Sequence, residues 1–187
     1  MLQIFSAKQR LVGAFRWPLL FLLVGLLLPS CAHAQLSAYA EFTASDLHEG
    51  PSGDDLYGGT VGVLLDGPIF FKRIVASADV QVRDVNNGGE RLVGVAIGPR
   101  VSFPLKRLKL TPYAEFMVGF ARYRASDEAG AENTTDDQWQ TNAGVSRQIS
   151  SHLDIVADYS YSQFGANLGE YRPKSYSVGV VFHLAKR

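Results

Sequence analysis

The sequence predicts an all-β protein, namely an eight-stranded antiparallel up-and-down transmembrane β-barrel. Three observations predict this fold class: a leading segment with the layout of a secretory signal, eight later segments in which apolar and polar residues alternate, and connections that alternate between long and short. Together they divide the chain of 187 residues into a cleavable signal peptide at 1–34 and a transmembrane barrel at 35–187.

The first 34 residues show the three parts of a secretory signal peptide. Lys8, Arg10 and Arg16 form a basic stretch, the apolar run WPLLFLLVGLLL occupies 17–28, and Ala32-His33-Ala34 predicts cleavage before Gln35. The apolar run has 12 residues, whereas a membrane-spanning helix needs roughly 20. Two alternatives are an uncleaved membrane anchor, which the short run disfavours, and a lipoprotein acylated at Cys31, which Pro29 disfavours.

The composition argues against several classes of function. Lys and Arg total 18, as do Asp and Glu, but the signal peptide holds three basic residues and no acid, so the remainder carries 15 basic and 18 acidic side chains. This mild acidity argues against nucleic acid as a partner. Because the only cysteine is Cys31, the mature chain has no disulfide and no thiolate metal ligand. Phosphate-binding, dinucleotide-binding and G-x-S-x-G patterns do not occur, so we expect no cofactor and no enzymatic activity.

Eight segments after Gln35 alternate with a period of two, which predicts strands. They span 35–46, 56–66, 72–84, 89–103, 108–124, 137–149, 152–164 and 174–184. Tilted strands cross a bilayer with about 9 to 11 residues, so each segment is long enough. We therefore predict one domain that these strands fill.

The connections predict which end of the barrel faces which compartment. Those after the first, third, fifth and seventh strands are polar and mostly long: Leu47 to Asp55, Val85 to Gly88, Ala125 to Asp136 and Gly165 to Pro173. Those after the other strands are tighter, at 67–71, 104–107 and 150–151. Short periplasmic turns that alternate with longer external loops are typical of bacterial outer-membrane barrels, and an even strand number places both termini on the periplasmic side.

The residues opposite the apolar face indicate that the apolar face contacts lipid. The last predicted strand carries an outward face of Tyr176, Val178, Val180, Phe182 and Leu184. The opposite faces mix small residues with isolated charges, as in Gly94, Ala96, Gly98 and Arg100. Small residues suit the interior of an eight-stranded barrel, which is just wide enough for side chains. We also predict interfacial aromatic girdles containing Tyr57, Phe103, Tyr123, Trp139 and Phe182.

Nine ionisable residues are predicted to point into the lumen. By strand phase these are Glu41, Arg73, Asp79, Arg83, Arg100, Glu115, Asp154, Asp158 and His183. Buried charges must be paired or hydrated, because an unpaired one costs several kcal/mol. We predict a lumen plugged by salt bridges; the alternative is a small gated pore whose selectivity these charges set.

Two other groups of residues have both an ordinary and a functional interpretation. Acidic residues gather in the third external loop (Asp127, Glu128, Glu132, Asp136, Asp137) and the first (Glu49, Asp54, Asp55). They are typical of solvated loops, although they could also bridge divalent cations to anionic glycolipid or support adhesion. A catalytic triad drawn from Ser150, Ser151, His152, Asp154 and His183 has no supporting motif, so we interpret that group as chance proximity.

The glycine-rich alternating strands and the closing strand SYSVGVVFHL at 175–184 carry a family resemblance. Over residues 35–187 the chain resembles the small outer-membrane β-barrel family that includes the OmpA transmembrane domain and OmpX. The resemblance implies a bacterial outer-membrane location, contact with lipid and lipopolysaccharide, assembly by periplasmic chaperones and the barrel-assembly machinery, and a monomer. The family usually ends on an aromatic residue, whereas here five residues follow Phe182. Since the sequence stops at the predicted barrel, we expect no peptidoglycan-binding domain like the one that follows the barrel in OmpA.

Three functions are compatible with this sequence. The first is a structural or surface-interaction barrel with a plugged lumen and external loops available for recognition. The alternatives are a narrow porin-like channel and a soluble, lipocalin-like periplasmic ligand binder.

Overall fold

The computed structural model describes residues 35–47, 55–70, 74–127, 130–164 and 171–184. The predicted signal peptide at 1–34 lies outside the described residues. The described chain forms eight strands and no helix, and so contains no helix long and apolar enough to span a membrane. The strands are β1 (Gln35–Asp46), β2 (Asp55–Phe70), β3 (Ile74–Asn86), β4 (Glu90–Ser102), β5 (Leu110–Asp127), β6 (Gly130–Gln148), β7 (Leu153–Phe164) and β8 (Lys174–His183).

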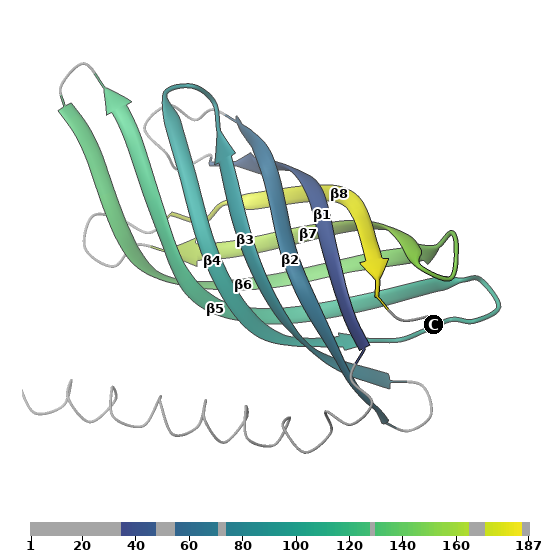
Figure 1. Ribbon diagram of the computed structural model, residues 1–187. Helices are drawn as coiled ribbons and strands as arrows, with labels where there is room; N and C mark the ends of the chain where they lie inside the picture. The colour runs from purple at the N-terminus through teal and green to yellow at the C-terminus, as the bar shows by residue number, and fades with distance from the viewer. Residues whose placement is uncertain (1–34, 48–54, 71–73, 128–129, 165–170, 185–187) are drawn as a thin grey trace, which may run out of the picture. The chain divides into compact units, whose positions relative to one another are not determined.

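The strands close into one barrel (Figure 1). Each strand pairs antiparallel with the next in sequence, and β8 pairs with β1 from Ser37 opposite His183 to Asp46 opposite Lys174. Closure satisfies the backbone hydrogen bonds that an open sheet edge would leave unmet in lipid. The predicted fold class is therefore confirmed. We call the end where β1 starts and β8 ends the periplasmic end, and the opposite one the external end.

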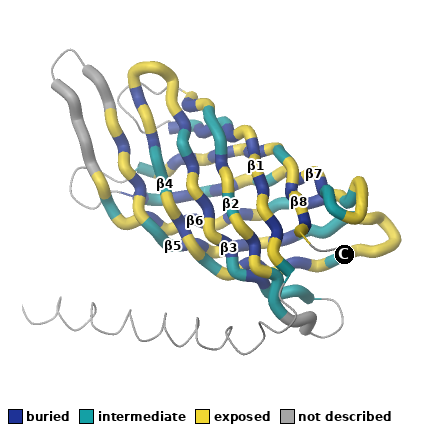
Figure 2. Tube along the Cα trace, in the orientation of Figure 1, coloured by how far each residue is buried: buried dark blue, intermediate teal, exposed yellow. Residues whose placement is uncertain are grey.

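The two faces of the sheet have opposite polarity, and Figure 2 shows the alternation of buried and exposed residues along each strand. In β8 the side chains of Tyr176 and Val178 are exposed, whereas those of Ser175 and Ser177 are buried. Side chains alternate between faces with a period of two, so the outside is apolar and the inside is polar. This polarity fits a barrel surrounded by lipid and is opposite to that of a soluble ligand-binding barrel.

The third external connection differs from its predicted form. We predicted a loop at 125–136, but β5 continues to Asp127 and β6 begins at Gly130, so Asp127 pairs with Gly130. Pairing of β6 with β7 starts only at Gln138, and Figure 1 shows β5 and β6 extending past the other strands. Above the membrane both faces of a hairpin meet water, so a polar composition there does not distinguish strand from loop.

The first periplasmic connection also starts later than predicted. β2 continues through Gly67, where we predicted a turn, and ends at Phe70. The pairing register with β3 shifts between Asp66 and Ile69, on either side of Pro68. Proline cannot donate to the ladder, so strands accommodate it at such irregularities. The predicted lumen residue Arg73 falls in 71–73, outside the described residues.

Candidate functional site

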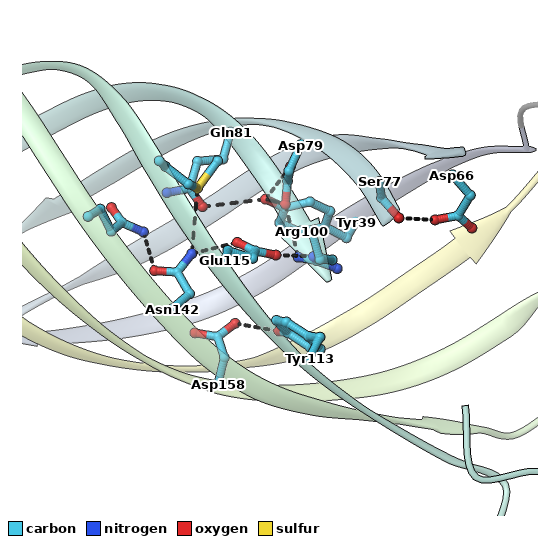
Figure 3. A network of polar contacts seen from close by, with 12 residues as sticks. Tyr39, Asp66, Ser77, Asp79, Gln81, Arg100, Tyr113, Glu115, Asn142 and Asp158 are labelled. Atoms are coloured by element: carbon cyan, nitrogen blue, oxygen red, sulfur yellow. Dashed lines mark hydrogen bonds and ion pairs between the residues drawn. The ribbon is translucent and has the colours of Figure 1, made fainter. Parts of the chain in front are cut away.

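The centre of the lumen is organised around Arg100, as Figure 3 shows. The Arg100 Nη2 lies 2.9 Å from Asp79 Oδ2, and its Nε donates to Glu115 Oε1. Glu115 is the cross-strand partner of Arg100, and Asp79 comes from β3 on the other side of β4. All three side chains are buried. One guanidinium therefore bridges two carboxylates from neighbouring strands, as its fork of donors allows.

Two tyrosine rings flank the same guanidinium. The Arg100 Cζ lies 4.1 Å from the Tyr113 ring centroid and 5.7 Å from that of Tyr39, within range of cation–π attraction. Each tyrosine lies opposite a glycine: Tyr39 faces Gly62, and Tyr113 faces Gly144. A Cβ atom added at Gly62 would lie 2.4 Å from the Tyr39 ring, and one at Gly144 would lie 2.5 Å from the Tyr113 ring. The glycines thus make room for the rings.

Hydrogen bonds extend this central network along the strands. The Tyr39 hydroxyl donates to Asp79 at 3.1 Å, and the Tyr113 hydroxyl donates to Asp158 at 3.1 Å. On the other side, Asn142 donates to Glu115 at 2.7 Å. Side-chain hydrogen bonds then continue along β6. Gln138 donates to Gln140 at 3.0 Å, and Gln140 donates to Asn142 at 2.6 Å. The polar side chains of the centre therefore bind one another across the lumen.

Arg83 occupies a second polar region, on the external side of the centre. Its Nε donates to Thr60 at 3.3 Å, and its Nη1 donates to Ser175 at 3.1 Å. Thr60 lies opposite Arg83 on one side and opposite Glu41 on the other, so Glu41 is two strands away at the same level. Glu41, which is buried, lies against Gly179 of β8. Glycine again makes room for a long side chain.

A third polar group, at the periplasmic end, is built around His183. Its Nε2 lies 3.1 Å from Asp154 Oδ2, and its Nδ1 lies 2.7 Å from the Ser37 hydroxyl. The three side chains are almost completely buried. Of the residues considered for a triad, the structure brings Asp154 to His183, but the serine beside His183 is Ser37, not Ser150 or Ser151.

Apolar side chains fill the external end of the lumen. The cluster contains Leu47, Leu56, Val85, Leu92, Ala121, Tyr123 and Phe164, and Tyr171 packs against it. The prediction that Tyr123 belongs to an interfacial girdle is wrong, because its side chain is fully buried inside the barrel. Tyr123 shares the inward phase of Glu115 and Ala121, and strand phase decides the face even near a strand end. The other girdle candidates, Tyr57, Phe103, Trp139 and Phe182, are exposed on the outside.

The structure thus places the predicted lumen residues in three groups. Asp79, Arg100, Glu115 and Asp158 belong to the centre, Glu41 lies near Arg83, and Asp154 joins His183. Sequence reasoning missed Tyr39, Tyr113 and Asn142, which complete the central network. Each of the two tyrosines lies opposite a glycine on the neighbouring strand, and this pairing could have identified them. It cannot be recognised from the sequence until the register between the strands is known. Within the described ranges, no three His, Cys, Asp or Glu side chains converge as metal ligands do.

Comparison with protein families agrees with this inside-out barrel. Residues 22–183 match the model of the outer membrane protein beta-barrel domain. The chain belongs to this outer-membrane barrel family. The protein is therefore a bacterial outer-membrane barrel, and the resemblance to small outer-membrane barrels is confirmed. No curated protein matches the sequence significantly.

Solved structures share the barrel at low sequence identity. Neisserial surface protein A is 15% identical with a TM-score of 0.55, and the match covers 80% of this chain and 96% of that one. Ail of Yersinia pestis is 10% identical with a TM-score of 0.55, covering 81% and 97%. The outer membrane enzyme PagL is 14% identical with a TM-score of 0.50, covering 78% and 98%. The family fold thus occurs in an enzyme as well, so function depends on the site.

Proposed function

We propose that this outer-membrane barrel is closed to solutes and acts as a structural scaffold that presents an external surface. The observation that carries the proposal is the enclosure of Arg100 by Asp79, Glu115 and the rings of Tyr39 and Tyr113. These groups come from β1, β3, β4 and β5 and meet inside a lumen that is only just wide enough for side chains. The apolar cluster at the external end adds a second obstruction in series.

Liposome swelling tests whether the lumen is closed. Vesicles containing the purified protein are diluted into an isotonic monosaccharide solution, and their swelling is compared with that of protein-free vesicles and of vesicles with a general porin. A closed barrel swells at the protein-free rate. Swelling that approaches the porin control would refute the proposal and favour the narrow channel.

The net charge of the external end indicates the charge of the partners that its surface can bind. At or beyond the external strand ends, in 46–55, 84–91, 122–137 and 164–174, the sequence places 12 acidic and five basic residues. Ail, which shares the fold, has been crystallised in complex with the heparin analogue sucrose octasulfate. Net negative charge here repels such a polysulfated ligand. We therefore propose that the external surface binds cationic partners, or anionic glycolipid through divalent cations.

Shortening the β5–β6 hairpin tests this surface role. Replacing 126–131 by Asn-Gly joins Ala125 to Glu132, which are cross-strand partners, by a favoured two-residue turn. The change removes Asp127 and Glu128 but keeps every residue of β5 and β6 that pairs with β4 or β7. Cells displaying the protein should adhere to polylysine-coated surfaces more than to heparin-coated ones, and the shortened variant should adhere less. Preferential adhesion to heparin would refute the assigned charge preference.

We further propose that the barrel is not an enzyme, although Ser37, His183 and Asp154 resemble a catalytic triad in composition. The Ser37 side chain has no solvent exposure, so a substrate cannot reach its hydroxyl. A nucleophile must be reachable as well as hydrogen-bonded to its base. A fluorophosphonate probe should therefore fail to label the folded protein. Labelling that Ser37→Ala abolishes would show an accessible nucleophile and contradict the proposal.

Export and assembly form the last part of the proposed function. We propose that cleavage before Gln35 releases a monomeric barrel, which periplasmic chaperones and the barrel-assembly machinery insert among phospholipid and lipopolysaccharide. Mass spectrometry of the protein extracted from outer membranes should give the mass of residues 35–187. A species acylated at Cys31, or one that retains the leading segment, would contradict the cleavage site.

A further inference from the structure

The turn between β4 and β5 concentrates positive charge at the periplasmic end. Lys106, Arg107 and Lys109 lie within four consecutive residues, and all three are exposed. A fourth exposed cation, Arg147, lies on β6 opposite Leu110, the first residue of β5. Four cations therefore share one short region of the barrel rim.

Exposed carboxylates do not balance this charge in the part of the periplasmic end that the structure describes. Its acidic residues are Asp66 and Asp154. Asp154 is buried beside His183, and Asp66 accepts a hydrogen bond of 2.7 Å from Ser77 on the lumen side. The cationic turn thus presents uncompensated positive charge to whatever covers the rim.

Two leucines lie among the cations of the same turn, and both are exposed. Leu105 is 47% exposed and Leu108 is 63% exposed. Nearby Phe103 and Ile149 are also exposed, and they continue the apolar outer face of the barrel. A turn that met only water would gain nothing from two exposed leucines, whereas at a membrane interface apolar groups enter the acyl region while cations stay near head groups.

Hydrogen bonds hold the turn in a defined shape. The Leu105 amide donates to the Leu110 carbonyl at 2.7 Å, and the Leu108 amide donates to the Leu105 carbonyl at 3.0 Å. Lys109 has φ of 53°, the only positive φ of a non-glycine residue in the described chain. Its carbonyl accepts from the Gln148 amide at 3.0 Å, which ties the turn to the end of β6. This tie keeps the turn next to Arg147.

We propose that this turn is a binding site for the head group of an anionic phospholipid in the periplasmic leaflet. Arg107, Arg147 and the two lysines would hold the phosphate, with the guanidinium groups suited to bidentate contact. Leu105 and Leu108 insert beside the acyl chains. A cell-wall polymer also carries negative charge, but it would leave the leucines without an apolar partner. The site is independent of whether the lumen conducts.

Lipid selectivity tests the proposal. Protein purified from outer membranes is placed in phosphatidylcholine vesicles with a minority of phosphatidylglycerol, and spin-labelled forms of the two lipids report their relative association with the barrel. One surface cation contributes roughly a fivefold preference for anionic lipid, so the wild type, with four cations at this site, should prefer phosphatidylglycerol by well over that factor. Lys106→Gln/Arg107→Gln/Lys109→Asn should lose most of it; asparagine is chosen because it tolerates positive φ.

The matched control removes three cations from the other end of the barrel, as Arg91→Gln/Arg122→Gln/Arg124→Gln. It should retain most of the preference, and heat-modifiable migration on a denaturing gel should show that both variants are folded. The proposal is overturned if the wild type shows no preference for phosphatidylglycerol, or if the Lys106→Gln/Arg107→Gln/Lys109→Asn variant keeps the wild-type preference. It is also overturned if isolated peptidoglycan binds the wild type and a Leu105→Ser/Leu108→Ser variant equally while phosphatidylglycerol shows no enrichment.

Discussion

The lumen is filled in two different ways along its length. At the centre, Arg100 bridges Asp79 and Glu115, and the three charges depend on one another. At the external end, Leu56, Val85 and Tyr123 pack as an ordinary apolar core. Removing one member of a buried charge group leaves the other charges uncompensated, whereas removing one apolar side chain leaves only a cavity. The centre should therefore respond more sharply to single substitutions than the external end.

The largest effect is expected for Arg100→Met. It leaves Asp79 and Glu115 buried without their cation, so the free energy of unfolding in urea should fall by about 3–5 kcal/mol. The triple variant Asp79→Asn/Arg100→Met/Glu115→Gln removes all three charges and should recover most of that loss. A triple variant no more stable than Arg100→Met would contradict the charge coupling.

At the external end, Leu56→Ala should cost less. Leu56 has no solvent exposure, and truncation of a buried leucine costs about 2–5 kcal/mol. We expect a value in the lower half of this range, because Leu56 is near a strand end where neighbours can move into the space. The same urea titration measures it. A loss as large as that of Arg100→Met would remove the distinction between the two regions.

The glycine that accommodates Tyr113 can be tested by Gly144→Ala. The added methyl would overlap the Tyr113 ring and would also lie 2.7 Å from the Asp158 Cβ, and such overpacking costs about 1–3 kcal/mol. Gly59→Ala is the matched control, because a Cβ there would meet only the Glu41 carbonyl oxygen at 3.5 Å. The control should change stability by less than about 0.5 kcal/mol. Equal effects at the two glycines would show that the ring contact is not the cause.

The smallest effect is expected outside the lumen, at the Asp84–Arg91 pair. The Arg91 Nε lies 2.9 Å from Asp84 Oδ1, but both side chains are about half exposed. Exposed ion pairs contribute about 0–1 kcal/mol and are screened by salt. Asp84→Asn should therefore lower stability only slightly, and the difference should vanish at high salt. A large loss of stability that does not depend on salt would contradict the claim that the exposed Asp84–Arg91 pair contributes less than the buried Arg100 group.

Local alternation in the sequence was sufficient to predict the strands and their faces. Side chains alternate with a period of two, so the inward phase of Asp79, Arg83 and Arg100 follows once each strand is located. The extension of β5 and β6 beyond the barrel was not predictable in this way, because a hairpin surrounded by water has no apolar face. The polar composition of 125–136 therefore predicts a loop, whereas β5 and β6 extend into this segment.

The partners of the inward charges could not be predicted from phase alone. Which carboxylate meets Arg100 depends on the register between β3, β4 and β5, and register is a property of pairs of strands. The contact of His183 with Ser37 likewise requires closure of β8 on β1. Strand phase does predict the buried position of Tyr123, which shares the inward phase of Glu115, whereas its position near a strand end wrongly suggests the interfacial girdle.

Planar-bilayer recording tests the central claim most directly, namely that charge pairing and apolar packing close the lumen in series. Wild type, Arg100→Ser/Glu115→Ser, Tyr123→Ser/Phe164→Ser and the combined quadruple variant are recorded under the same conditions, after gels confirm folding. We predict no channel events for the wild type, none or rare events for each double variant, and frequent ohmic events for the quadruple variant. Steady conductance by the wild type would contradict the closed lumen.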